Sequence, residues 1–294
     1  MTAIENARVT VVGLGLMGGS LAGALKANCA CREVVGVARR SETAVLAVQR
    51  GLVDRASTNL ATAVSEADVV VLATPVRTIV ELLPVVGRLA RPGCLIMDLG
   101  STKRVIVEAM SALPEHVQAV GGHPMCGKET SGLAAADPGL YRGRAFVLTP
   151  LDRTDEAALS LASELVEAIG ALPLVLGAER HDRLAAAVSH LPYLLACGLI
   201  GTAEEVAESD NALWQLAASG FRDTSRLAAS EVTMMLDILL SNSEAVLDVL
   251  SIYERQLRGL AKLVRSGDEQ RLQSELNGIR TLRLETGAPS RSRA

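Results

Sequence analysis

Short apolar runs alternate with segments of helical periodicity through the first 177 residues of the chain. The runs are rich in Val and are mostly continuous, which is typical of strands in a parallel sheet that is buried on both faces. The expected strands are residues 8–12, 33–38, 68–73, 94–98, 117–120, 145–148 and 172–176. Helical segments separate most of these runs, so the pattern predicts a doubly wound α/β domain over residues 1–177.

After Gly177 the pattern changes to Ala and Leu at helical spacing, and clusters of β-branched residues become rare. We therefore expect an all-α second domain over residues 178–286. The expected helices are residues 179–208, interrupted at 189–193 around Pro192, then 230–263 and 268–284, with a polar break at 218–226. Pro in a helix interior kinks the helix and frees a carbonyl group. The tail GAPSRSRA, residues 287–294, is predicted to be disordered.

The helices expected after residue 230 carry more apolar surface than one packing partner can cover. Their apolar positions include Met234, Met235, Ile238, Leu239, Val246, Val249, Leu250, Leu257, Leu260 and Leu263. An apolar face of this width predicts an interface between the helical domains of two copies, and hence a homodimer.

The first expected strand leads into a glycine-rich turn and then into a helical segment, residues 21–27. A strand, the pattern G-x-G-x-x-G and a helix are the parts of a Rossmann-type dinucleotide site. The first Gly makes the tight turn, the second lets the backbone approach the pyrophosphate, and the third lets the helix pack on the strand. The predicted cofactor-binding residues here are Gly13, Gly15, Leu16, Met17 and Gly18. The alternative is a plain glycine-rich turn.

The second strand ends without the acidic residue that would bind the ribose 2′-hydroxyl of NAD. It is followed instead by Arg39, Arg40 and Ser41. Two guanidinium groups and a hydroxyl suit a 2′-phosphate, which Arg can bind with two hydrogen bonds. The sequence therefore favours NADP, while solvated surface arginines, or an enzyme that accepts both cofactors, are the alternatives.

Polar residues follow three further strands, at the edge where a cofactor should lie. Thr74 and Pro75 follow the third strand, and Ser101 follows the fourth. His123 follows the fifth, in the loop-like stretch GGHPMCGKETSG, where a His can take or give a proton near neutral pH. The alternatives are a turn that merely contains a His, and a Ser101 that caps the next helix.

Two polar stretches interrupt the helical domain. Ser189, His190 and Tyr193 surround Pro192, where a kink could face a cavity, although a hydrogen-bonded core His is the alternative for His190. Arg222 and Arg226 are four residues apart and would share one helix face, where they could clamp a carboxylate. A surface pair of Asp223 with Arg226 is the alternative there.

The amino-acid composition argues against some classes of binding partner. The 294 residues are 49% hydrophobic and 2% aromatic, with a formal net charge of -4, so neither nucleic acid nor a membrane surface is expected as a partner. Five cysteines without framework spacing predict reduced thiols in a cytosolic protein. We expect no signal peptide, no transmembrane helix and no metal site.

Taken in order, five motifs resemble the prephenate/arogenate dehydrogenase family: GLGLMGGSLA, GSTK, GGHPMCGKETSG, SHLPY and SGFRDTSR. The resemblance covers roughly residues 9–284 and is greatest to the short, single-function arogenate dehydrogenases. It implies a small-molecule substrate, a cyclohexadienol, which is oxidatively decarboxylated to an aromatic ring on the route to tyrosine. It also implies a dimer formed by the helical domain.

The resemblance implies a role for each polar residue. His123 would accept the proton of the substrate hydroxyl, and Ser101 would bond the same hydroxyl or His123, near the nicotinamide. Arg226 would hold a substrate carboxylate with help from Arg222.

The remaining contacts would come from the helical domain. Ser189 and His190 lie where this domain closes over the substrate in the family. Prephenate-preferring members often carry His at the position of Tyr193, so this departure weakens a prephenate assignment. We therefore expect arogenate with NADP, with prephenate, or both substrates, as the alternative.

Two hypotheses lie outside this family. A β-hydroxyacid or 6-phosphogluconate-type dehydrogenase shares the GLGLMG start but uses a Lys on the helix after the Rossmann domain, and residues 179–208 contain no Lys. A non-catalytic NADP-binding sensor would keep the glycines but would not need His123, Ser101 and Arg226 together.

Overall fold

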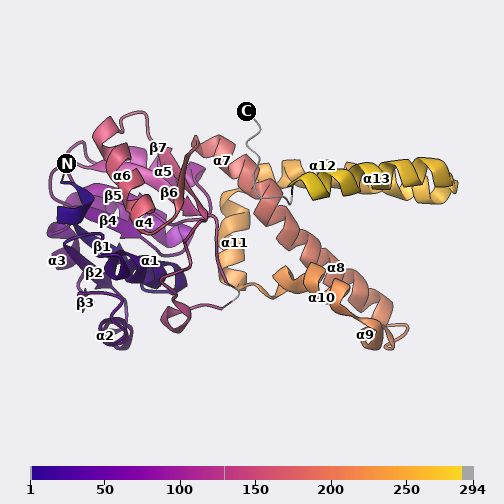
Figure 1. Cartoon of the computed structure of the whole chain (residues 1–294), viewed down its shortest axis with the longest axis horizontal. Helices are drawn as coiled ribbons and strands as arrows, with labels where there is room; N and C mark the ends of the chain where they lie inside the picture. Colours follow the sequence, from indigo (N-terminus) through magenta and orange to yellow (C-terminus); the bar gives the residue numbers. More distant parts are fainter. Residues whose placement is uncertain (1, 129, 287–294) are drawn as a thin grey trace. The chain divides into compact units, whose positions relative to one another are not determined.

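The structure, a computed structural model, describes residues 2–128 and 130–286 (Figure 1). An eight-stranded sheet has the order β3-β2-β1-β4-β5-β6-β7-β8. The strands are β1 (Arg8–Val12), β2 (Glu33–Val37), β3 (Arg55–Ser57), β4 (Val69–Leu72), β5 (Leu95–Asp98), β6 (Gln118–Pro124), β7 (Ala145–Pro150) and β8 (Leu172–Val175). Neighbouring strands are parallel except β6 and β7, so the predicted doubly wound sheet is confirmed.

Helices cover both faces of the sheet because strand side chains alternate between two apolar layers (Figure 1). On β4, Val69 and Val71 belong to one layer, whereas Val70 and Leu72 belong to the other. The first layer contains α1 (Leu16–Ala27), α2 (Ser41–Gln49) and α6 (Glu156–Ala168), and the second contains α3 (Leu60–Ser65), α4 (Val76–Leu89) and α5 (Arg104–Ser111). Burial on both faces explains why the strands read as continuous apolar runs.

The sheet differs from the prediction in two places. β3 was not predicted, because its three residues, Arg-Ala-Ser, form no apolar run and are held mainly by pairing with β2. β6 continues through His123 to Pro124, because β7 pairs with its second half beyond the last partner on β5. The expectation that His123 lies in a turn or loop is therefore wrong, since it lies on a strand.

The second part of the chain is helical. A run of α7 (Ala178–Ala185), a π-helical turn (Ala186–His190) and α8 (Leu191–Ala207) is followed by α9 (Leu213–Leu216), α10 (Ser219–Ser225), α11 (Val232–Ser241), α12 (Ser243–Ser266) and α13 (Glu269–Thr286). The interruption predicted around Pro192 is a wide turn and not a break. It changes the hydrogen-bond register where the proline has no N–H to donate.

The helix expected over residues 230–263 is wrong in one respect, because Asn242 separates α11 from α12 with φ −128° and ψ 29°. The polar break expected at 218–226 contains the short helix α10, and Arg226 begins the 3-10 turn that follows it. Both differences arise at polar residues. The spacing of apolar residues predicts helices but does not show which partners polar side chains will bond.

The run from Ala178 to Ala207 is long and apolar enough to cross a membrane by length and composition. This differs from the expectation of short, interrupted apolar segments, because the π-helical turn carries the helix through Pro192. Only 22% of its most apolar stretch is buried inside the chain. The run therefore has an apolar surface for a further partner.

By internal contacts the chain divides into residues 1–246 and residues 247–294. The second unit contains most of α12 and all of α13. The domain boundary expected at residue 177 stays a prediction. The tail expected to be disordered, residues 287–294, lies outside the described residues.

Candidate active site

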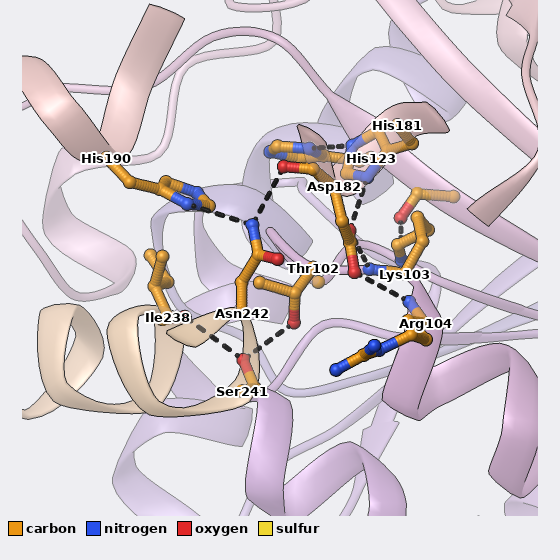
Figure 2. Close-up of polar contacts among 12 residues, drawn as sticks. Thr102, Lys103, Arg104, His123, His181, Asp182, His190, Ile238, Ser241 and Asn242 are labelled. Atoms are coloured by element: carbon orange, nitrogen blue, oxygen red, sulfur yellow. Dashed lines mark hydrogen bonds and ion pairs between the residues drawn. The ribbon is translucent and has the colours of Figure 1, made fainter. Parts of the chain in front are cut away.

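Three of the four histidines lie together in the interior (Figure 2). His123 comes from β6, His181 from α7 and His190 from the end of the π-helical turn, and none is more than 8% exposed. Buried polar side chains of this kind are held by hydrogen bonds. The partners of each imidazole therefore decide what it can do.

His123 and His181 form a chain with Asp182. The Nδ1 atom of His123 lies 2.7 Å from Nε2 of His181, and Nδ1 of His181 lies 2.8 Å from Oδ1 of Asp182. Burial raises the pKa of Asp182, whereas hydrogen bonds from His181 and from two backbone amides lower it. The lowering effects together are larger, so the pKa lies below its ordinary value. Asp182 is thus a carboxylate that anchors one end of the chain, and His123 is the other end.

The same carboxylate caps α5. Oδ1 of Asp182 accepts the backbone N–H of Lys103 at 2.6 Å, and Oδ2 accepts that of Arg104 at 2.9 Å. These amides would otherwise lack partners at the helix N-terminus. The alternative role of Ser101 as the cap is therefore wrong, because α5 begins at Arg104 and no side chain of its own segment caps it. Asp182 ties α7 to the turn that carries Ser101.

A buried ion pair joins this turn to β6. Lys103 and Asp98 are both 0% exposed, and the Lys103 ammonium group donates to Asp98 and, at 2.6 Å, to the carbonyl oxygen of Gly122. Asp98 also accepts the backbone N–H groups of Gly100 at 2.7 Å and Gly122 at 2.9 Å. Burial raises the pKa of Asp98 and lowers that of Lys103, while their attraction opposes both shifts. The pair fixes β6 just before His123.

Asn242 explains the break between α11 and α12. Its side-chain amide donates to the backbone oxygen of Asp182 at 2.8 Å and lies 3.3 Å from Nδ1 of His190. Nearby, the hydroxyls of Thr102 and Ser241 are 2.8 Å apart (Figure 2). Nε2 of His190 is buried and has no hydrogen-bond partner among the described residues. Since Nδ1 accepts from Asn242, Nε2 carries the proton and is a free donor.

The environment of His123 keeps it uncharged. Burial lowers its pKa well below 6.5. His181, Lys103 and His190 lower it further, because a positive charge on any of these groups opposes a second one on His123. A neutral imidazole at pH 7 is a proton acceptor. His123 has the electrostatic properties of a general base.

The edge of the sheet beside His123 fits a nicotinamide dinucleotide. Gly13, at φ +102°, follows β1, and a Cβ there would lie 2.7 Å from the oxygen of Ala73. A Cβ on Gly18 would lie 1.9 Å from the oxygen of Gly13, so α1 packs on this turn only through glycine. The hydroxyl of Thr74, after β4, is buried without a partner in the described part of the chain. An orphaned hydroxyl beside a glycine turn suits a polar ligand.

The N-terminus of α1 is suited to bind a phosphate group. Gly15 is its N-cap, no side chain occupies the cap, and nothing lies within 4 Å of a Cβ built there. This leaves the first amides of the helix, at Leu16 and Met17, open to an anion. Arg39 and Arg40 follow β2 with exposed side chains, and Ser41 begins α2. Neither guanidinium group has an ion-pair partner among residues 2–128 and 130–286, so both are available to a 2′-phosphate.

Other predicted residues are not part of the His123 network in Figure 2. Arg222 on α10 and Arg226 in the next turn have exposed side chains, and both segments pack against α8. Ser189 is exposed and Tyr193 is half-buried, at the junction of the π-helical turn with α8. Their contact with a substrate stays a prediction.

The network also contains residues that were not predicted as site residues: Asp98, Lys103, His181, Asp182 and Asn242. In the sequence, Asp98 and Lys103 could be recognised only by their place at, and just after, the end of an expected strand. The pair His181-Asp182 carried no distinct signal, because it lies within a run of five polar residues, 179–183, at the start of α7. Asn242 gave no signal beyond its polarity within an apolar segment.

Two family models match most of the chain. Residues 21–174 match the model described as "Prephenate dehydrogenase, nucleotide-binding domain". Residues 177–278 match the model described as "Prephenate dehydrogenase, dimerization domain".

Prephenate and arogenate dehydrogenases of other organisms match this chain over nearly its whole length. Prephenate dehydrogenase of Bacillus subtilis (strain 168) is 34% identical over 90% of this chain and 72% of its own. A crystal structure of prephenate dehydrogenase from A. aeolicus, in complex with hydroxyphenyl propionate and NAD+, has a TM-score of 0.89 and 30% identity, covering 97% of this chain and 99% of that one. Arogenate dehydrogenase of Synechocystis has a TM-score of 0.81 and 31% identity, covering 94% and 98%.

Proposed function

Because the chain belongs to the prephenate dehydrogenase family, we propose that it oxidatively decarboxylates arogenate to tyrosine with NADP as its cofactor. The observation that carries this proposal is the neutral, buried imidazole of His123 at the edge of the sheet that bears the dinucleotide turn. Membership of this family argues against a β-hydroxyacid dehydrogenase and against a non-catalytic sensor.

The reaction starts at the hydroxyl on ring C4 of the substrate. His123 accepts the hydroxyl proton on Nε2, because its Nδ1 faces His181. The electron pair of the C4–H bond leaves as hydride, for which the nicotinamide cofactor supplies the acceptor when bound. Ser101, in the turn after β5, would bond the same hydroxyl and orient it toward His123.

The second half of the reaction makes the ring aromatic. Carbon dioxide leaves from C1, and the electron pair of the broken bond enters the ring while the C4 oxygen becomes a phenolate. The phenolate takes back the proton that His123 holds, so His123 ends neutral and the protons balance. Aromatisation drives this step, and the protein therefore needs to supply positioning and one proton acceptor.

Residues of the helical part would hold the rest of the substrate. Arg226, supported by Arg222, is proposed to bind a substrate carboxylate, since Arg forms paired hydrogen bonds to such groups. Ser189, His190 and Tyr193 are proposed to contact the ring and its side chain. The unpartnered Nε2–H of His190 supports this assignment, because it would donate to a substrate oxygen.

The preference for NADP leads to a prediction about Arg39 and Arg40. We expect the double variant Arg39→Ala/Arg40→Ala to bind NADP about 10- to 100-fold more weakly, because charged hydrogen bonds to the 2′-phosphate are lost. Affinity for NAD should change less than threefold. Fluorescence titration of both reduced cofactors measures the effect, with Arg88→Ala, an exposed Arg on α4, as the control for the loss of a positive surface charge. Equal weakening for both cofactors would refute the assignment.

Prephenate with NAD is the second candidate, and the names of the relatives favour it. The B. subtilis protein is named a prephenate dehydrogenase, and the A. aeolicus structure contains NAD+. Steady-state cofactor reduction at pH 7.5, in a grid of the two substrates against the two cofactors, tests both candidates. The proposal predicts the highest kcat/KM with arogenate and NADP. A higher value with prephenate would refute the substrate assignment, and turnover in no combination would refute the function.

We also propose a homodimer in the cytoplasm. The match to a dimerization domain over residues 177–278 supports the dimer, and so do exposed apolar side chains of this region, among them Val188 (66%) and Leu240 (59%). A second chain would cover the apolar surface of the run from Ala178 to Ala207.

A further inference from the structure

The hydrogen-bond chain behind His123 determines which of its nitrogens carries the proton. An ionised carboxylate only accepts, so Nδ1 of His181 must donate to Asp182. In neutral His181, Nε2 is then an acceptor, and Nδ1 of His123 must donate to it across 2.7 Å. This order leaves Nε2 of His123 unprotonated.

We propose that His181 and Asp182 are positioning residues that hold His123 in the Nδ1–H tautomer, with its Nε2 lone pair available to the substrate. The inference rests on the proposed function of His123 as the proton acceptor. It adds to that function two residues that touch neither the substrate nor the cofactor. Their proposed effect on catalysis passes through His123, although Asp182 also caps α5.

The anchor of the chain is rigid. Two backbone amides of the β5–α5 turn fix the Asp182 carboxylate, and Asn242 holds its backbone oxygen. His181 and Asp182 are 2% and 3% exposed, so water does not compete for these hydrogen bonds. Rotation of the His123 ring, or a switch to its other tautomer, would leave a buried donor or acceptor unpaired.

The chain also favours the reacting state of His123. When Nε2 takes up the substrate proton, Nδ1–H continues to donate to His181, whose own Nδ1–H faces the negative Asp182. The new positive charge on His123 therefore forms beside the negative end of the His181 dipole, with the Asp182 carboxylate behind it, and both stabilise it. In the opposite tautomer, Nε2 of His123 would already carry a proton and could not accept another. An imidazole base in the wrong tautomer loses its function even when its position is unchanged.

Two substitutions of His181 separate positioning from folding. His181→Leu removes the acceptor for Nδ1–H, and we expect kcat to fall about 10²- to 10³-fold, within the range known for lost proton-acceptor function. KM and the Kd for cofactor should change less than threefold, because the His181 side chain is 2% exposed and both of its ring nitrogens face His123 and Asp182. His181→Gln places an amide oxygen near the position of Nε2 and should restore kcat to within about tenfold of the wild type.

The matched controls are His116→Leu and His116→Gln. His116 precedes β6 and bonds the backbone oxygen of Ala90 at 3.1 Å, outside the network. Both controls should keep the kcat of the wild type. A kcat of His181→Leu that equals that of His116→Leu would overturn the proposal, as would a loss in His181→Gln equal to that in His181→Leu when both variants melt at wild-type temperature.

A spectroscopic measurement tests the tautomer directly and needs no turnover. Nitrogen-15 NMR of histidine-labelled protein separates protonated from unprotonated ring nitrogens, and four histidines give a spectrum that single variants can assign. At pH 8 we expect His123 to be protonated at Nδ1 in the wild type and to shift toward Nε2–H in His181→Leu. A wild-type His123 protonated at Nε2 would overturn the inference. Absence of turnover in the wild type would instead refute the proposed function and leave the tautomer assignment intact.

Discussion

Replacement of His123 with Asn is expected to lower kcat by about 10²- to 10⁴-fold, the range that a positioned general base contributes. Asn keeps a polar side chain on β6 but cannot accept a proton at neutral pH. The Kd for NADP should change less than threefold, because the glycine turn and Arg39 lie on other strands and loops. Stopped-flow or steady-state cofactor reduction measures the rate, and fluorescence titration measures the affinity.

The control is His116→Asn, the same change at the His that lies outside the network. The pH profile gives a second readout. Burial lowers the pKa of His123 well below 6.5, so the wild-type rate should persist below pH 6.5 and fall only when His123 gains a proton. This acidic fall should be absent from the residual rate of His123→Asn. A variant that keeps kcat within threefold of the wild type would contradict the role of His123.

The second large effect is expected on stability. Replacement of Lys103 with Met should lower the free energy of unfolding by about 3–5 kcal/mol, because it leaves the fully buried Asp98 without its counter-charge. Urea unfolding at pH 7 measures the loss. Without Lys103, burial raises the folded-state pKa of Asp98 above its unfolded value, against the smaller opposing effect of the hydrogen bonds from Gly100 and Gly122, so the protonated side chain is favoured. The loss should therefore be smaller at low pH and grow as the pH rises through the folded pKa.

Two variants test the cause. The double variant Asp98→Asn/Lys103→Met removes both charges and should recover part of the lost stability, because no unpaired charge is left buried. The single amide oxygen of Asn can still accept from one of the two backbone N–H groups that Asp98 bonds, those of Gly100 and Gly122. Lys128→Met breaks the exposed pair with Asp137 and should leave stability nearly unchanged. A loss for Lys103→Met no larger than that for Lys128→Met would contradict the role of the buried pair.

The sheet was predictable because its signal is local. Strands buried on both faces must be continuously apolar, as in residues 69–72, and the glycine turn stands directly after β1. β3 was not predictable in this way, because only its pairing with β2 makes it a strand. The same holds for His123, whose strand exists because β7 pairs beyond the end of β5.

The position of the proposed proton acceptor, His123, was predictable from the sequence, whereas the residues that hold it in place were not. Ser101 follows β5 and His123 lies in the second half of the neighbouring strand β6, so topology alone brings them to one edge. His181 and Asp182 lie 58 and 59 residues further along the chain, and no periodicity tells which helix will place them behind His123. The break at Asn242 has the same origin, since its side chain serves partners that are 60 and 52 residues away. The pattern of hydrophobic and polar residues along the chain does not show which polar side chains will form long-range hydrogen bonds.

The proposed reaction can be followed with arogenate and prephenate that carry deuterium at ring C4, with the label traced by mass spectrometry during turnover. We expect the deuterium to appear in the reduced cofactor and one carbon dioxide to be released per cofactor reduced. The aromatic product should carry no deuterium at C4. Aromatic product formed without reduced cofactor, or cofactor reduced without loss of carbon dioxide, would contradict the proposed reaction.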